Sequence, residues 1–261
     1  RLSGTLDFYH RNTKDLLNEI PVPAGSNFSN RILTNVGNIE GKGFELSITA
    51  TPIQTKRFSW DVTYNISSNS TKITKLNAVD LPGYQGVPTG HVEGGTGTNA
   101  QIHSVGYAPG TFFLYQQKYD AQGKPLEGQF VDRNDDKVIN EQDKYRTHSP
   151  EPKVTMGLST SLSFDRWTLS TSLRSNIGNY IYDNINAYMA HHAAVLNSGQ
   201  YFKNTTPEIN NSNFTNTSNT QILSDYYLHK ASFIKMDNLS LGYDFGRIFG
   251  KASLRASATV Q

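Results

Sequence analysis

The sequence contains no cysteine, which excludes disulfide scaffolds, thiol catalysis and zinc sites built from thiolates. It has no apolar run near the ~18 residues that a transmembrane helix needs. It also lacks an excess of either charge, since 24 Lys and Arg stand against 22 Asp and Glu. A net charge of +2 argues against a nucleic-acid partner and against a polybasic membrane anchor. A membrane β-barrel is not excluded, because its strands are only half apolar.

Strict alternation of apolar and polar residues is the main positive signal, and it predicts long β-strands. In residues 58–68, for example, Trp60 and Val62 share one face while Asp61 and Thr63 share the other. Most of the predicted strands are about 10 residues long, as transmembrane barrel strands are. Seven strands are predicted, over residues 2–11, 43–51, 58–68, 153–164, 167–178, 233–245 and 253–261.

One of these strands contains a change of phase. Ile234 and Met236 do not alternate in step with Leu239 and Leu241. The change predicts a β-bulge or a register shift near Asn238.

Short and long connections alternate along the chain. The short ones span residues 54–57, 165–166 and 246–251, whereas the long ones span 12–42, 69–152 and 179–232. An up-and-down barrel has short turns on one side of the membrane and long loops on the other. Aromatic residues also gather near the short turns, as an interfacial girdle would, although the β-propensity of aromatic residues offers a competing explanation. They are Phe58, Trp60, Phe164, Trp167, Tyr243, Phe245 and Phe249.

These features predict an all-β, antiparallel, up-and-down transmembrane β-barrel segment with long extracellular loops. Seven strands do not close a bacterial barrel, and open edges in lipid would leave backbone groups unpaired, so we expect the chain to be a segment of a larger barrel. The shared phase predicts a common lipid-facing side, with the odd-even neighbours facing the lumen. Its residues are Phe44, Leu46, Ile48, Val62, Leu158, Leu169, Leu173, Leu254 and Ala256.

A second interpretation stays open on the residues alone. It is a soluble extracellular β-sheet module that binds carbohydrate, with a calcium ion shaping one loop. That fold would bury the apolar faces of the strands in a core.

Several stretches, in this order along the chain, resemble the SusC/RagA-type TonB-linked outer-membrane transporters of the Bacteroidetes. The stretches are Tyr9 to Leu17, Asn35-Val36-Gly37-Asn38, Gly41 to Leu46, Pro109-Gly110-Thr111-Phe112, the acidic run from Asp132, Ser149 to Lys153, Ser224-Asp225-Tyr226-Tyr227, Ala231 to Lys235, and Asn238 to Tyr243.

The resemblance implies a barrel of about 22 strands with an N-terminal plug. Residues 1–261 would be its C-terminal part, strands fifteen to twenty-one, without the plug and the last strand. It further implies an outer-membrane nutrient importer for glycans or peptides. Its partners would be a SusD-like surface lipoprotein, outer-membrane lipid, and TonB through the missing N-terminal part.

One acidic segment resembles a calcium-binding loop. Oxygen ligands recur at positions 1, 3, 5, 9 and 12 of residues 132–143, and a backbone carbonyl is available at position 7, as a hard cation requires. Lys137 stands where such loops usually place glycine, and position 12 is Asp, which is shorter than the usual Glu. The alternative is a solvated acidic turn. The candidate Ca²⁺ ligands are Asp132, Asn134, Asp136, Val138, Asn140 and Asp143.

No catalytic constellation is present: neither an H-E-x-x-H nor a G-x-S-x-G motif occurs. We therefore expect no enzyme activity. Residues 197–220 are rich in Asn, Ser and Thr, which is typical of a long solvated loop and which also suits contact with sugars or a partner protein.

Overall fold

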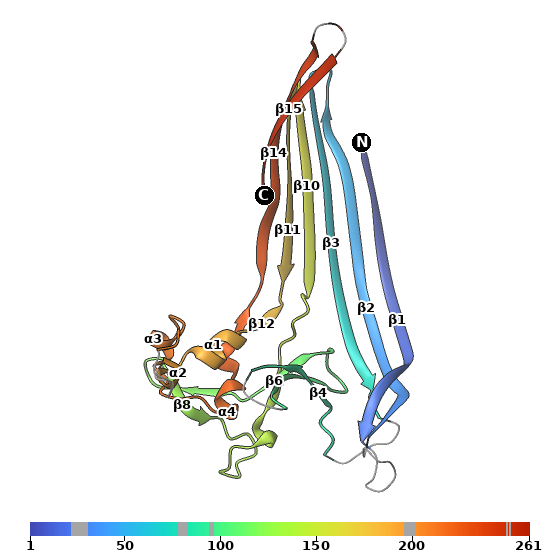
Figure 1. The fold of residues 1–261 in the computed structure, drawn as a ribbon. Helices are drawn as coiled ribbons and strands as arrows, with labels where there is room; N and C mark the ends of the chain where they lie inside the picture. Colours follow the sequence, from blue (N-terminus) through green and yellow to red (C-terminus); the bar gives the residue numbers. More distant parts are fainter. Residues whose placement is uncertain (22–30, 78–82, 94–96, 196–201, 249, 251) are drawn as a thin grey trace.

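The computed structural model describes residues 1–21, 31–77, 83–93, 97–195, 202–248, 250 and 252–261. Seven long strands form one twisted antiparallel sheet in the order β1-β2-β3-β10-β11-β14-β15, here called the wall sheet (Figure 1). Each strand pairs with its neighbours along this order, so the predicted all-β, up-and-down arrangement of seven strands is confirmed. The strands are β1 Leu2–Pro21, β2 Arg31–Gln54, β3 Phe58–Lys75, β10 Val154–Phe164, β11 Trp167–Ile177, β14 Phe233–Ile248 and β15 Ala252–Val260.

The first three strands are longer than the sequence indicates. The expectation of a loop over residues 12–42 is wrong for most of that range, because β1 continues to Pro21 and β2 begins at Arg31. The alternation of apolar and polar residues is interrupted by register shifts between Thr13 and Leu17, where Asp15 adopts a left-handed φ of 58°. Such an irregularity interrupts alternation without ending a strand.

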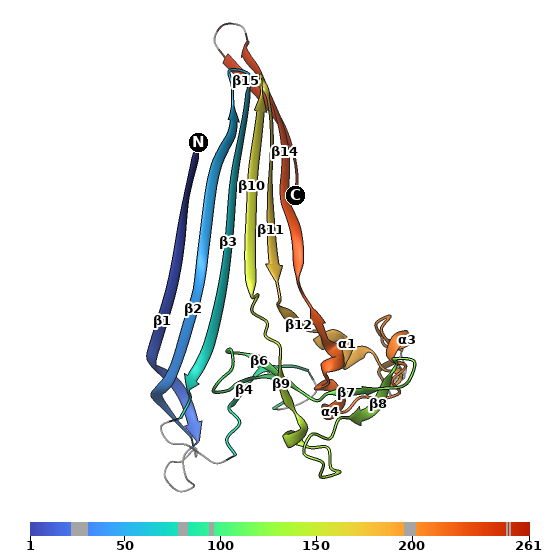
Figure 2. The ribbon, with the colours of Figure 1, turned by 180° about the vertical axis from the view of Figure 1, so that it is seen from behind.

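Strand register places the apolar residues on one face of the wall sheet. Leu158 lies opposite both Tyr64 and Leu173, and Leu169 lies opposite Leu241. Directly opposed residues in antiparallel strands point to the same side. No described element covers this face, which both views show as one side of a single layer (Figures 1 and 2). Leu241 remains 45% exposed, so the packed core that the soluble alternative requires is not formed here.

The predicted irregularity near Asn238 is confirmed. Ser172 pairs with Asn238 and the next residue, Leu173, pairs with Met236, so Asp237 is extra. This bulge brings Met236 to the same face as the leucines that follow it. Arg174 contacts the extra residue through an ion pair, with 2.9 Å between its Nε and the Asp237 carboxylate.

The two long connections that follow β3 and β11 fold together at one end of the wall sheet (Figure 2). We call this region the loop module. No helix among the described residues is long and apolar enough to span a membrane. The strands of the loop module are β4 Val87–His91, β5 Asn99–His103, β6 Thr111–Leu114, β7 Gln117–Tyr119, β8 Pro125–Phe130, β9 Tyr145–Thr147, β12 Tyr180–Tyr182 and β13 Leu228–Lys230. Its helices are α1 Asn184–Met189, α2 His192–Val195, α3 Ile209–Ser212 and α4 Asn219–Ile222, together with the 3₁₀ turns Glu141–Asp143 and Asp225–Tyr227.

The hydrophobic core of the described chain lies in the loop module and not in the wall sheet. Leu114, Phe214 and Ile222 are buried together there, and Tyr226 packs its ring 5.8 Å from that of Phe214. The two connections therefore form a folded body and are not simple solvated loops.

Candidate functional site

The polar face of the wall sheet carries a tyrosine that lies across a neighbouring strand. Tyr9 of β1 is paired with Gly43 of β2, and a Cβ at Gly43 would lie 2.7 Å from the Tyr9 hydroxyl oxygen. That hydroxyl donates a hydrogen bond to the Asn69 side chain on β3, at 3.2 Å. The ring thus bridges three strands because the middle one has no side chain in its way.

Beside this tyrosine the polar face is hollowed. Gly41 lies between Arg11 of β1 and Thr71 of β3, and a Cβ built on it would meet no atom within 4 Å. The missing side chain leaves a cavity of about 410 Å³. Its lining residues are Tyr9, Arg11, Thr13, Ile39, Gly41, Glu45, Asn69 and Thr71.

Two opposite charges line this hollow without a partner in the described part of the chain. The Arg11 side chain makes no hydrogen bond or ion pair there, and neither does the Glu45 side chain. Glu45 also lies directly opposite Asp7, and like charges in such a position repel one another. Within the described ranges, the hollow therefore offers unpaired donors on Arg11 and unpaired acceptors on Glu45.

The first half of the predicted calcium loop is held by turns in which its own side chains accept backbone hydrogen bonds. The Asp132 carboxylate accepts from the N–H groups of Asp135 and Lys137, both at 2.7 Å, and Asp136 accepts from Val138 at 2.8 Å. The Asn134 amide in turn donates to Asp136 at 2.8 Å. Lys137 has a φ of 66°, so the non-glycine residue at position 6 does adopt the left-handed turn.

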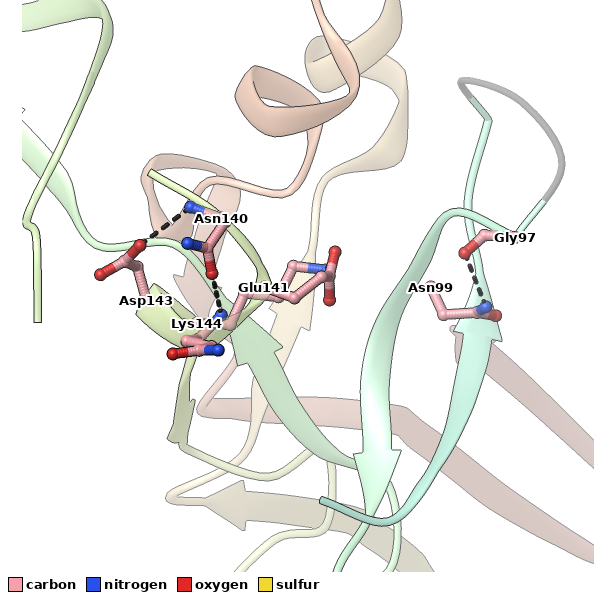
Figure 3. Close-up of polar contacts among 7 residues, drawn as sticks. Gly97, Asn99, Asn140, Glu141, Asp143 and Lys144 are labelled. Carbon is pink, nitrogen blue, oxygen red and sulfur yellow. Dashed lines mark hydrogen bonds and ion pairs between the residues drawn. The ribbon is translucent and has the colours of Figure 1, made fainter. Parts of the chain in front are cut away.

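The second half closes on a buried carboxylate. Asp143 is fully buried and accepts from the Arg133 N–H at 2.8 Å. It also accepts from the Asn140 N–H at 2.9 Å (Figure 3). These backbone hydrogen bonds lower the pKa of the Asp143 carboxyl below its ordinary value. The Asn140 side chain accepts from the Gln142 N–H at 2.8 Å, and it donates to the Val138 carbonyl at 3.2 Å.

The six candidate ligands therefore belong to one hydrogen-bonded loop, but they do not form a closed cage of carboxylates. Across the described ranges, no group of three or more His, Cys, Asp or Glu side chains is arranged to hold a metal ion. Asp136 is exposed and Asp132 is partly buried, whereas Asp143 is buried. Calcium binding remains a prediction.

A cation near this loop is packed on aromatic rings. Lys144 has a side chain only 6% exposed, and its ammonium lies 5.2 Å from the centre of the Tyr115 ring and 5.8 Å from that of Phe113. It also forms an ion pair with Glu141 at 2.8 Å. The contacts attach the calcium-like loop firmly to the core of the loop module.

Sequence reasoning missed a buried polar hub. Gln117 donates to the carbonyls of Leu126 at 2.7 Å and Gln129 at 3.1 Å, while its own oxygen accepts from Ser224 at 2.9 Å and Gln221 at 3.1 Å. The hub joins the two long connections of the chain. A single glutamine carries no sequence signal for such a role.

The wall sheet and the loop module have counterparts among known proteins. The chain is 38% identical over 276 residues to the TonB-dependent receptor SusC of Bacteroides thetaiotaomicron, and the match covers 100% of this chain and 26% of that receptor. It is 27% identical over 279 residues to the TonB-dependent receptor P3 of Formosa agariphila, covering 98% of this chain and 26% of that receptor. The chain thus spans about a quarter of the length of these curated relatives.

The structure also has a solved counterpart. A chain of the RagAB peptide transporter superposes with a TM-score of 0.69 at 25% identity, and the match covers 100% of this chain and 30% of that one. No model of a known protein family matches the sequence.

Proposed function

The chain belongs to the SusC/RagA family of TonB-dependent outer-membrane receptors, and on this premise we propose that it forms the wall and outer loops of a nutrient importer. Its relatives are receptors and transporters rather than enzymes. The wall sheet is a segment of an outer-membrane β-barrel, and its short turns would face the periplasm while the loop module faces outward.

One observation supports this role above the others. The wall sheet is a single layer with Leu, Phe and Val on one face and mostly Ser, Thr and Asn on the other. An apolar face without a covering layer suits lipid, and a hydroxyl- and amide-rich face suits a wet lumen. The complete receptor would carry cargo along that lumen.

The partners follow from the same proposal. A SusD-like lipoprotein would dock on the exposed side of the loop module, and TonB would act through the N-terminal part of the receptor. The cargo would be a glycan or a peptide, and the solved counterpart is a peptide transporter.

Uptake by cells tests the importer. A strain that lacks the full-length receptor should lose uptake of fluorescently labelled oligosaccharides or peptides, and the wild-type gene should restore it. Removing TonB or the lipoprotein should abolish the restored uptake. Normal uptake of both cargo classes by the deletion strain would contradict the proposal.

We also propose that residues 132–143 bind one calcium ion. The support is the conformation of the loop: Lys137 supplies the left-handed turn at position 6, and Asp132 and Asp136 are already folded back along the loop. Each of their oxygens accepts one hydrogen bond and retains a second lone pair. The bound ion would brace the loop against the core of the loop module.

Calorimetry on the full-length receptor tests this site. Calcium should bind to the chelator-treated protein, and Asp132→Asn together with Asp136→Asn should remove that binding. Asp135→Asn is the matched control, because Asp135 is not among the candidate ligands. No heat of binding at millimolar calcium, or equal binding by the double variant, would leave only a hydrogen-bonded turn.

A further inference from the structure

The hollow beside Gly41 lies at the outer mouth of the barrel. On β1 and β2, Phe8 and Phe44 form an apolar pair on the lipid face, and polar pairs follow it toward the loop module. The next pair on that face is His10 with Lys42, and the His10 ring contacts the Glu40 carboxylate at 2.9 Å. Because such polar groups avoid hydrocarbon, the bilayer core ends at the two phenylalanines.

The hollow combines an open floor, an aromatic ring and two opposite charges. Gly41 provides an open floor, and Tyr9 provides a ring that lies across Gly43 with 37% of the residue exposed. Among the described residues, the Arg11 guanidinium and the Glu45 carboxylate have no partner, and both line the same cavity of about 410 Å³. A small set of polar groups around an aromatic surface is typical of a site for a small ligand.

We propose that this hollow is a binding subsite for a neutral oligosaccharide at the entrance to the lumen, a proposal that rests on the importer function above. A sugar ring would lie against the exposed face of Tyr9 and extend over Gly41. Its hydroxyls would accept from Arg11 and donate to Glu45.

The balance of charges favours a neutral ligand with many hydroxyls over a charged peptide. One cation and one anion line the hollow, and their charges cancel. Each hydroxyl can both donate and accept a hydrogen bond, so a single sugar satisfies the Arg11 guanidinium and the Glu45 carboxylate. A ligand with one net charge would satisfy one of the two groups and be repelled by the other.

Filling the floor is the sharpest test. Gly41→Val places a side chain in open space on a strand, where a β-branched residue is well tolerated. Ser47→Val is the matched control, because Ser47 lies on the same face of the same strand but outside the hollow, opposite Thr5 and Asn65. Arg11→Gln and Glu45→Gln remove each charge with little change in shape.

The experiment is calorimetry on the full-length receptor with neutral glucan, fructan and xylan oligosaccharides, and with zwitterionic peptides of similar length. Gly41→Val should weaken oligosaccharide binding by about tenfold or more, whereas Ser47→Val should leave it within about twofold. Each Gln variant should weaken it by a smaller factor. Barrel assembly, read by heat-dependent gel mobility, should be unchanged in all four.

Three results would overturn the subsite. These are equal oligosaccharide affinity in Gly41→Val and wild type, absence of oligosaccharide binding by the wild type, and a loss confined to peptides. If uptake by cells still depends on the receptor in any of these cases, the importer stands and only the subsite fails. If the deletion strain takes up both cargo classes normally, the importer function itself is contradicted.

Discussion

The wall sheet and the loop module are stabilised in opposite ways. The wall sheet has continuous ladders of backbone hydrogen bonds and almost no buried side chain, whereas the loop module has short strands around a core that includes Leu114 and Phe214. The first arrangement depends on lipid to cover its apolar face, and the second supplies its own interior. Substitutions in the two regions should therefore destabilise the protein in different ways.

The largest effect is expected in the core of the loop module. Phe214 is 1% exposed, so Phe214→Ala should destabilise the module by about 3–5 kcal/mol, through lost burial and the cavity left behind. Limited proteolysis of the intact receptor should then cut the module while the barrel stays assembled. Phe202→Ala is the control, because Phe202 is 83% exposed. Equal protease resistance of the two variants would contradict the assignment of the core.

A slightly smaller effect is expected in the middle of the wall sheet. Leu158→Arg places a charge near the bilayer centre and should cost about 2–4 kcal/mol when the intact receptor folds into lipid vesicles. Ser159→Arg, one residue along, should be tolerated because its side chain enters the lumen. If Ser159→Arg impaired folding as strongly as Leu158→Arg, the two faces would be assigned wrongly.

These two regions also show what sequence patterns can and cannot reveal. Alternation is local, so all seven wall strands and the bulge near Asn238 were predictable from neighbouring residues. The extension of β1 past Asp15 was not, because a left-handed residue interrupts the pattern while the strand continues. Contacts such as Gln117 with Ser224, 107 residues apart, leave no local trace, so the loop module was expected only as loops.

The two candidate sites differ in the same respect: one consists of neighbouring residues and the other of residues from separate strands. Residues 132–143 were recognisable because all their oxygen ligands lie in one short segment. The hollow was not, because Tyr9, Gly41 and Asn69 come from three strands and meet only through register. A glycine is read as a turn signal in sequence, and its role as an open floor appears only when its cross-strand neighbours are known.

A pH-dependent effect is expected in the loop module. Burial lowers the pKa of His103, whose Nδ1 accepts a hydrogen bond from the Gly110 N–H at 3.0 Å. The folded module therefore favours the neutral ring. Its contribution to stability is complete above the unfolded pKa of about 6.5 and is lost as the pH falls toward the lower folded value.

Proteolysis of the module at a series of pH values measures this contribution. Cleavage should become faster in the wild type as the pH falls below about 6.5. In His103→Asn, which keeps an acceptor but does not titrate, this part of the pH dependence should be absent. A pH profile that is identical in the two proteins would exclude His103 as its source.

The smallest effect is expected at the short-turn end of the wall sheet. Trp167 lies opposite Phe164 and Tyr243, with its ring 4.6 Å from that of Tyr243, so the predicted aromatic residues do line one face here. Phe249 lies outside the described residues.

If these rings form an interfacial girdle, Arg at position 167 can reach water and headgroups, and Trp167→Arg should cost only about 0–1 kcal/mol. A soluble core predicts the reverse, since the loss of a packed Trp would then cost more than the loss of Leu158. Folding Trp167→Arg and Leu158→Arg receptors into lipid vesicles side by side compares the two penalties directly. A penalty for Trp167→Arg equal to or above that for Leu158→Arg would mean that depth in a membrane does not set the cost, because the residue nearer the turn would gain nothing from its position.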